Sequence, residues 1–258
     1  WWPIDTCAPL GNGHIHGTWL VTGGQGRGVL QQISTAVFRD PAALMARVAA
    51  VLAHLGRQVR HTTILLPELL PTRRGAAWHA AADGTHWRLW TYIGEARTLE
   101  TLSTPEQAEA AGRAFEQLQA ALADANLPAP DPIPGFMQLD HYLGCLDAAA
   151  AAAAMPSSRE RKLLRGIHAR RDLAGSFSQR EQVIHGDCKV NNLLFAHGST
   201  TEVRAVLDLD TVMRGHWAWD AGDLVRSAAA GPNGFALDRF AGVVRGLRAS
   251  ARIDAGPE

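Results

Sequence analysis

The feature that most constrains this chain is a run of chemically functional residues set between short apolar segments. Residues 185–192 read His-Gly-Asp-Cys-Lys-Val-Asn-Asn, and two further acids, Asp208 and Asp210, follow in the run Val-Leu-Asp-Leu-Asp. Short apolar runs enter the motif, leave it and lead up to Asp208, at residues 183–184, 193–195 and 203–207. Such runs bounded by polar turns are typical of strands. The sequence therefore predicts acidic side chains in loops at strand ends.

The residue types in these loops favour phosphoryl transfer. Asp187 can take the proton from an attacking hydroxyl, and Lys189 can meet the transferred phosphate. Asn192 and Asp208 offer the hard oxygen donors that Mg²⁺ prefers. The spacing of His, Asp and Asn is also that of the protein-kinase catalytic loop. The alternative is an accidental spacing, with a histidine at a strand end and two solvated acids.

Two other residues of the motif are expected to take no part in chemistry. His185 is predicted to be a packed, hydrogen-bonded histidine. Cys188 has no neighbour that would form a Cys/His nucleophile pair, so we interpret it as a bystander.

Further stretches make the chain similar to the aminoglycoside phosphotransferase and choline kinase superfamily, and within it to the N-acetylhexosamine 1-kinase branch. They are residues 11–15 ahead of 18–21, residues 29–33 with 37–41, and residues 207–213 with 219–223. The resemblance implies an α+β, bilobal protein-kinase-like fold, with a small β-rich N-lobe over residues 1–93 and a larger, mainly helical C-lobe over residues 94–258. Related kinases continue for several more helices, so the chain is expected to be truncated. The resemblance also implies that Asp220 and Asp223 brace the catalytic loop.

Local patterns in the first ninety or so residues fit a β-rich lobe that includes one helix. Asp40 and Pro41 are typical of a helix start, and apolar residues at helical spacing follow them. An Asp-Gly pair at residues 83–84 favours a hairpin. We expect strands over 18–21 and 28–33, a helix over 41–55, hairpin strands over 78–81 and 87–90, and a last strand with its connection over 90–93.

Helical patterns dominate the remainder. Thr104 and Gln107 form a capping-box signature with an apolar face behind them. A proline-rich break follows between residues 128 and 134, and the alanine run 148–154 favours helix. Helices are also expected over 219–229 and 235–249.

The resemblance implies which residues meet the ligands. The nucleotide is expected on a loop ahead of a strand and on the connection between the lobes, at Gly11, Asn12, Gly13, Trp90, Tyr92 and Ile93. The acceptor is expected at His14 and Asp210. Each position has an alternative interpretation. The glycines can simply form a turn, and His14 can be a solvated loop histidine. Asp210 can contact the acceptor indirectly or be merely solvated.

Lysine is nearly absent from the chain. Lys162 and Lys189 are its two lysines, so the first 161 residues cannot provide the phosphate-binding strand lysine of kinases. Gln31 stands about where that lysine belongs, as in the N-acetylhexosamine branch that the chain resembles. Glutamine can hydrogen-bond to a phosphate but cannot neutralise it. We therefore expect Lys189 to supply the charge from the catalytic loop.

These features favour a kinase that uses ATP and Mg²⁺ and phosphorylates the anomeric hydroxyl of an N-acetylhexosamine. Two alternatives stay open: an aminoglycoside- or choline-type kinase with another alcohol acceptor, and a nucleotide-binding module without turnover. A cationic acceptor needs an acid-lined pocket, and the sequence shows no acidic cluster outside the catalytic strands.

Composition indicates the cellular compartment and the classes of partner. The formal net charge is zero, which argues against nucleic-acid and membrane partners. Cys7, Cys145 and Cys188 form neither an even disulfide framework nor a metal-binding spacing, which favours a reducing compartment. Without a long apolar segment or a signal-peptide pattern, we expect a cytoplasmic protein. The sequence does not indicate an oligomeric state.

Overall fold

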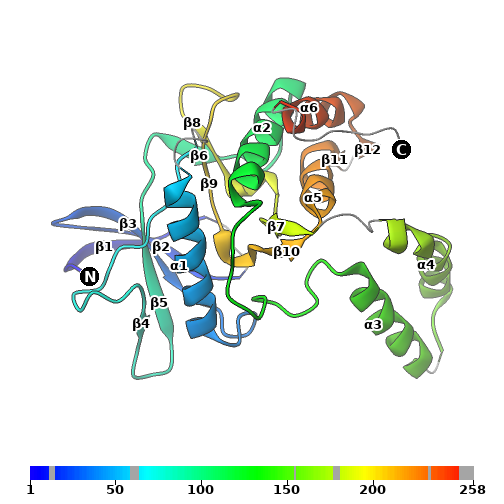
Figure 1. Ribbon diagram of the computed structural model, residues 1–258, viewed down its shortest axis with the longest axis horizontal. Coiled ribbons are helices and arrows are strands. Elements are labelled where there is room, and N and C mark those ends of the chain that lie inside the picture. The colour runs from blue at the N-terminus through cyan, green and yellow to red at the C-terminus, as the bar shows by residue number, and fades with distance from the viewer. Residues whose placement is uncertain (12–14, 59–63, 154, 177–180, 232–233, 250–258) are drawn as a thin grey trace.

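The computed structural model describes residues 1–11, 15–58, 64–153, 155–176, 181–231 and 234–249 (Figure 1). Its N-terminal part is a five-stranded antiparallel sheet with the strand order β1-β2-β3-β5-β4. The strands are β1 (Ile4–Pro9), β2 (Gly17–Gly23), β3 (Gly26–Gln32), β4 (His79–Ala80) and β5 (His86–Thr91). The strands predicted near residues 18–21 and 28–33 and the hairpin at residues 83–84 are confirmed.

Two features of this sheet differ from the prediction. β1 was not expected, because all of its residues are exposed and the strand lacks an alternation of apolar and polar positions. The separate last strand predicted over 90–93 does not form. Residues 90 and 91 instead complete β5, and the chain then leaves the sheet.

Helix α1 (Pro41–Arg57) packs against the sheet and begins as predicted (Figure 1). The Asp40 carboxylate accepts a hydrogen bond of 2.9 Å from the amide of Ala43, which satisfies one of the free donors of the first turn. The N-terminal half of α1 packs in a core with Phe38 and Trp90 of the sheet side. Its C-terminal half, with Val51 and Leu55, belongs to the core of the second lobe. The helix therefore joins the two cores.

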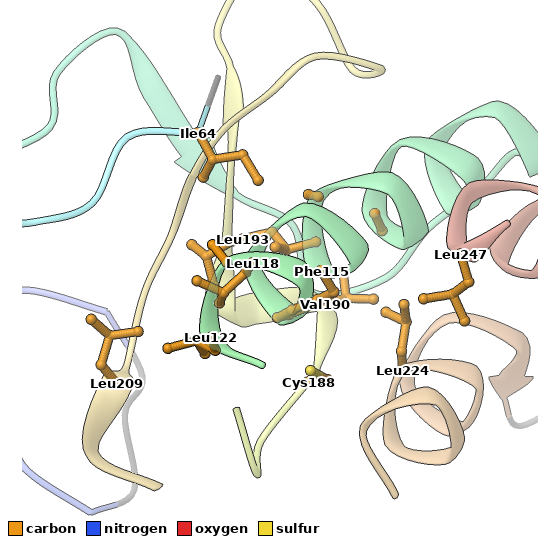
Figure 2. Close-up of a cluster of buried hydrophobic side chains, with 14 of the residues drawn as sticks. Ile64, Phe115, Leu118, Leu122, Cys188, Val190, Leu193, Leu209, Leu224 and Leu247 are labelled. Atoms are coloured by element: carbon orange, nitrogen blue, oxygen red, sulfur yellow. The ribbon is translucent and has the colours of Figure 1, made fainter. Parts of the chain in front are cut away.

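Helix α2 (Pro105–Leu122) is the centre of the second lobe. The predicted capping box is present, with Thr104 and Gln107 each bonding to the other's backbone. Figure 2 shows α2 side chains, among them Phe115 and Leu118, meeting buried residues of the catalytic region and of the last two helices. These helices are α5 (Trp217–Ala229) and α6 (Leu237–Leu247), close to the predicted ranges.

The three apolar runs around the motif are strands, as predicted. They are β7 (Gln182–Ile184), β8 (Leu193–Ala196) and β9 (Val203–Val206). β8 lies between β9 and β6 (Ala96–Thr98), whereas β7 pairs with β10 (Met213–Gly215). Short 3₁₀ turns, η3 (Val190–Asn192) and η4 (Leu209–Thr211), follow the two acidic positions. A small hairpin, β11 (Ala230–Gly231) and β12 (Gly234–Phe235), separates α5 from α6.

Two helices lie beside this body rather than inside it (Figure 1). They are α3 (Leu139–Ala152), which contains much of the alanine run, and α4 (Ser158–His168), followed by the 3₁₀ turn η2 (Arg171–Ser176). Leu143 is the one buried residue of α3, and α4 has none.

The order of a β-rich part followed by a helical part confirms the predicted α+β arrangement. The division at residue 93 stays a prediction, because the two parts share packing. Ile64 lies in the core of α2, and Leu65 forms a parallel bridge to Ala205 of β9. No helix among the described residues has the length and apolar character needed to cross a bilayer.

Candidate active site

The catalytic loop leaves β7 at Ile184 and folds back on itself around Asp187. The side-chain amide of Asn192 donates to the main-chain oxygen of Asp187 at 2.8 Å and to its Oδ2 at 2.9 Å. The ammonium of Lys189 lies 2.7 Å from the same Oδ2. Within the described residues, Oδ1 of Asp187 has no hydrogen-bond partner. One carboxylate oxygen is therefore fixed, and the other can meet a substrate hydroxyl.

A buried acid holds the start of this loop. Asp220 of α5 accepts 2.8 Å hydrogen bonds from the amides of His185 and Gly186 and a 2.9 Å bond from Gln119 of α2. These are charge-assisted bonds in a site with almost no exposure, which makes them strong. Asp220 thus braces the loop, as expected. Asp223, expected to do the same, instead pairs with Arg226 on its own helix.

Gly186 could not be another residue without moving the backbone. Its φ is +81°, and a Cβ there would lie 2.5 Å from the main-chain oxygen of Thr211. The hydroxyl of Thr211 donates to the main-chain oxygen of His185 at 3.0 Å. The catalytic loop and the segment after Asp208 therefore touch through their backbones.

His185 has the packed role that was predicted. It is fully buried, and its Nε2 bonds to the main-chain oxygen of Leu207 at 3.0 Å. Its Nδ1 accepts from the amide of Asp187 at 3.2 Å, and its ring meets Phe115 edge to face. Cys188 is also fully buried, and burial raises the pKa of its thiol well above the usual value.

The second acidic loop follows β9 and reaches the first through strand pairing. Leu193 of β8 pairs with Val206 of β9, and the amide of Leu207 donates to the main-chain oxygen of Asn192 at 2.8 Å. Asp208 therefore comes next to Asn192. It adopts a left-handed conformation, with φ 62° and ψ 68°, which non-glycine residues rarely take.

The three predicted acid and amide residues, Asp187, Asn192 and Asp208, lie at one site. Burial raises the pKa of the Asp208 carboxyl, and the charges of Asp210 and Asp187 raise it further. Like charges held this close favour a bound cation that relieves their repulsion.

The donor atoms fit Mg²⁺. Both hydrogen bonds of the Asn192 amide use its nitrogen, which leaves Oδ1 as a ligand atom. The Asp208 carboxylate has no hydrogen bond or ion pair to any residue that the structure describes. An amide oxygen and a carboxylate, with phosphate and water in the other positions, suit this ion. Within the same ranges, no group of three or more His, Cys, Asp or Glu side chains is arranged to hold a metal.

The residues predicted to meet the nucleotide are only partly described. Gly11, with φ +72°, lies in the connection between β1 and β2. Asn12, Gly13 and His14 lie outside the described residues. Tyr92 and Ile93 are partly exposed in the connection after β5, and the Arg27 guanidinium lies 4.4 Å from the centre of the Tyr92 ring. These contacts with a nucleotide, and that of His14 with an acceptor, stay predictions.

Gln31 and Trp90 have internal partners instead. The Gln31 carbonyl oxygen accepts from the indole of Trp90 at 2.7 Å and from Nε of Arg88 at 3.0 Å. Its amide nitrogen donates to Thr18 at 3.3 Å. Trp90 is buried against α1. The Trp90 indole nitrogen and the Gln31 carbonyl oxygen are thus used inside the sheet, and the predicted contacts of both residues with a nucleotide stay predictions.

Asp210 is buried and bonded to two residues of the N-terminal part, Arg88 and His16. Its carboxylate, 1% exposed, forms a bidentate ion pair with Arg88 of β5, at 2.7 and 2.6 Å. Nε2 of His16 lies 2.7 Å from the same carboxylate. Burial alone would raise the pKa of Asp210, but Arg88 and His16 lower it strongly. With both oxygens bonded internally, the predicted contact of Asp210 with an acceptor stays a prediction.

Sequence reasoning missed Arg88 and His16. One signal could have indicated Arg88, which is an arginine in the middle of an otherwise apolar and aromatic strand. A buried charge of this kind needs a partner.

The comparisons agree with this geometry. The profile of the phosphotransferase enzyme family matches residues 6–252. The fold is similar to that of a microcompartment-associated aminopropanol kinase, with 22% identity and a TM-score of 0.69 over 95% of this chain and 75% of that one. It is also similar to an amicoumacin kinase solved with AMP-PNP and Ca²⁺, with 13% identity and a TM-score of 0.65 over 94% of this chain and 72% of that one.

A third solved structure extends the likeness to choline kinases. This choline/ethanolamine kinase family protein from Mesorhizobium loti is 17% identical, with a TM-score of 0.57 over 94% of this chain and 69% of that one. The predicted bilobal kinase-like fold is thereby confirmed. Its structural neighbours lie in the aminoglycoside phosphotransferase and choline kinase superfamily. Because the family profile matches nearly the whole sequence, the chain belongs to the phosphotransferase enzyme family.

Proposed function

We propose that this phosphotransferase is an ATP- and Mg²⁺-dependent kinase that phosphorylates the anomeric hydroxyl of an N-acetylhexosamine, with Asp187 as the general base. The observation that supports it most is the convergence of Asp187, Asn192 and Asp208 at one site, with Lys189 beside the base. Phosphoryl transfer needs this set: a base for the hydroxyl, oxygen ligands for the metal, and a cation near the transferred group.

Asp187 has one oxygen free to act. Oδ2 is held by Asn192 and Lys189, so Oδ1 receives the proton of the acceptor hydroxyl. The acceptor oxygen forms its bond to the γ-phosphorus of ATP while the bond from that phosphorus to the β-γ bridging oxygen breaks, and ADP leaves. Lys189, beside the base, would offset the negative charge of the transferred phosphoryl group.

Asn192 and Asp208 are the residues that would hold Mg²⁺, which supplies charge compensation at the β- and γ-phosphates. A solved neighbour carries an ATP analogue with a divalent cation, which supports a nucleotide and metal site in this fold.

Most carboxylates around the two loops already have partners, which agrees with a neutral acceptor. Asp210 is paired with Arg88, Asp220 with backbone amides, and Asp223 with Arg226. In the described part of these loops and of α5, Asp187 and Asp208 are the acids left, and both have roles in transfer. A cationic acceptor gains little from carboxylates that already have partners.

One comparison favours a second acceptor class. The solved neighbour named for aminopropanol acts on a small amino alcohol, and its sequence identity to this chain is 22%. An amino-alcohol kinase would keep the same base and metal ligands and differ in the acceptor pocket.

The test is ADP formation by the purified protein with ATP and Mg²⁺, with each acceptor added separately: N-acetylglucosamine, N-acetylgalactosamine, aminopropanol, choline and kanamycin. The proposal expects stimulation by an N-acetylhexosamine and a product whose phosphate is released by mild acid, as anomeric phosphates are. Stimulation by an amine alone would assign the second class. Nucleotide binding without stimulation by any acceptor would favour a module without turnover.

A further inference from the structure

Arg88, Asp210 and His16 form a buried polar cluster that connects the N-terminal sheet to the loop of Asp208. Arg88 belongs to β5, His16 lies just before β2, and Asp210 lies in η4, directly after the proposed metal ligand. Arg88 is 2% exposed, so both members of its pair with Asp210 are out of contact with water.

Burial and internal bonds keep Arg88 from contacting a phosphate. Nη1 and Nη2 bind Asp210, Nε binds Gln31 at 3.0 Å, and the guanidinium lies 5.0 Å from the ring centre of Trp90. Nη1 also approaches the sulfur of Met45 in α1 at 3.9 Å. An arginine whose guanidinium is enclosed in this way does not contact a ligand itself. It can affect a ligand only through the residue that it binds, which here is Asp210.

The tautomer of His16 follows from its partners. Its Nδ1 accepts a hydrogen bond of 3.1 Å from the amide of Ser34, so the proton is on Nε2. Nε2 therefore donates to Asp210 at 2.7 Å. The ring stacks on Phe38 with a centroid distance of 5.4 Å, which fixes its orientation. Asp210 thus accepts bonds from two different segments of the N-terminal part.

What the cluster holds is the backbone beside Asp208. That residue has φ 62° and ψ 68°, a conformation that persists in a non-glycine residue only when its surroundings enforce it. Leu209 is buried, and Asp210 is held by three hydrogen bonds, so the chain is fixed immediately after Asp208.

We propose that Arg88, through Asp210 and with His16, is a positioning residue for the metal ligand Asp208. This inference rests on the proposed function of the site. Instead of a lysine on β3 that touches the nucleotide, an arginine on the neighbouring strand fixes the metal loop to the sheet.

This arrangement also explains why position 31 of β3 is a glutamine and not a lysine. Gln31 pairs with Arg88 across the sheet, and its carbonyl oxygen accepts from the arginine. A lysine at position 31 would place a second cation against the guanidinium, and like charges at this distance repel each other.

The experiment measures how the affinity for AMP-PNP depends on Mg²⁺ concentration, by calorimetry, for the wild-type protein, Arg88→Lys, Asp210→Asn and His16→Gln. His54→Gln is the control. His54 is also buried, but its partners are the main-chain oxygen of Ala121 and the carboxylate of Asp124, which belong to the end of α2 and the turn after it rather than to η4. Thermal unfolding is recorded in parallel, and the midpoints are compared at a temperature at which each variant is folded.

The Arg88 and Asp210 variants are expected to raise the Mg²⁺ midpoint at least about tenfold, as loss of a residue that orients a metal ligand does. His54→Gln should lower the melting temperature and leave the midpoint unchanged. Folded Arg88 or Asp210 variants with the wild-type midpoint would overturn the inference, as would failure of all three cluster variants to fold. A wild-type protein that binds no nucleotide with Mg²⁺ would instead contradict the proposed function.

Discussion

Asn192 holds Asp187 by two hydrogen bonds from one amide group, one to its main chain and one to its carboxylate, at 2.8 and 2.9 Å. The metal ligand and the base are therefore coupled directly, and a change in one changes the orientation of the other.

Replacing Asn192 by alanine should impair both functions. The variant loses a metal oxygen and the orientation of Asp187, so we expect turnover to fall by about 10²-fold or more and the Mg²⁺ requirement to rise. Asn191→Ala is the matched control, because the neighbouring Asn191 is exposed. Steady-state rates across a Mg²⁺ series measure both effects. Equal rates for the two variants would contradict this assignment.

Lys189→Ala should lower turnover more than Gln31→Ala. Lys189 lies beside Asp187 and provides positive charge, whereas Gln31 is bonded inside the sheet. We expect a loss of about 10²-fold for Lys189→Ala, the scale of removing one group that stabilises transition-state charge. Lys162→Ala removes the other lysine, which is exposed on α4, and should be silent. Equal, mild losses for Lys189→Ala and Gln31→Ala would refute this role of Lys189.

Close packing of α2 against α6 depends on glycine. A Cβ on Gly246 would lie 2.2 Å from the main-chain oxygen of Glu109 and 2.7 Å from the amide of Arg113. Gly246→Ala should therefore reduce the free energy of unfolding by roughly 1–3 kcal/mol through overpacking. Gly222 of α5 has open space around it, so Gly222→Ala should stabilise by about 0.5–1 kcal/mol. Urea unfolding compares them, and an undisturbed Gly246→Ala protein would argue against this interface.

The three cysteines should differ in reactivity. Cys7 and Cys145 are exposed, whereas Cys188 is buried and burial raises the pKa of its thiol, so little thiolate forms there near neutral pH. With a disulfide reagent such as DTNB, we expect two equivalents to react rapidly in the native protein and the third only after unfolding. Rapid reaction of all three would show that the catalytic loop is less enclosed than the structure indicates.

Local signals in the sequence predicted the elements that have them. The helix after Asp40, the capping box at Thr104 and the hairpin at residues 83–84 each depend on neighbouring residues, and each is present. The strands beside Asp187 and Asp208 were also predicted, and their pairing explains why residues distant in sequence meet.

Contacts between distant residues were not predictable from one sequence. Arg88 and Asp210 are 122 positions apart, and neither carries a local sign of the other. Asp210 was interpreted as a possible acceptor contact because its position in the motif was known, while its partner was not. A buried ion pair depends on tertiary packing, and periodicity contains no information about it.

The central claim is that Asp187 is the base of a phosphoryl transfer. The most direct measurement compares ADP formation by Asp187→Asn and the wild-type protein at saturating ATP, Mg²⁺ and the best acceptor, with AMP-PNP binding measured on the same samples. The account predicts that the variant binds the nucleotide and loses turnover by about 10³-fold, within the range for removal of a general base. Turnover within threefold of wild type would contradict it.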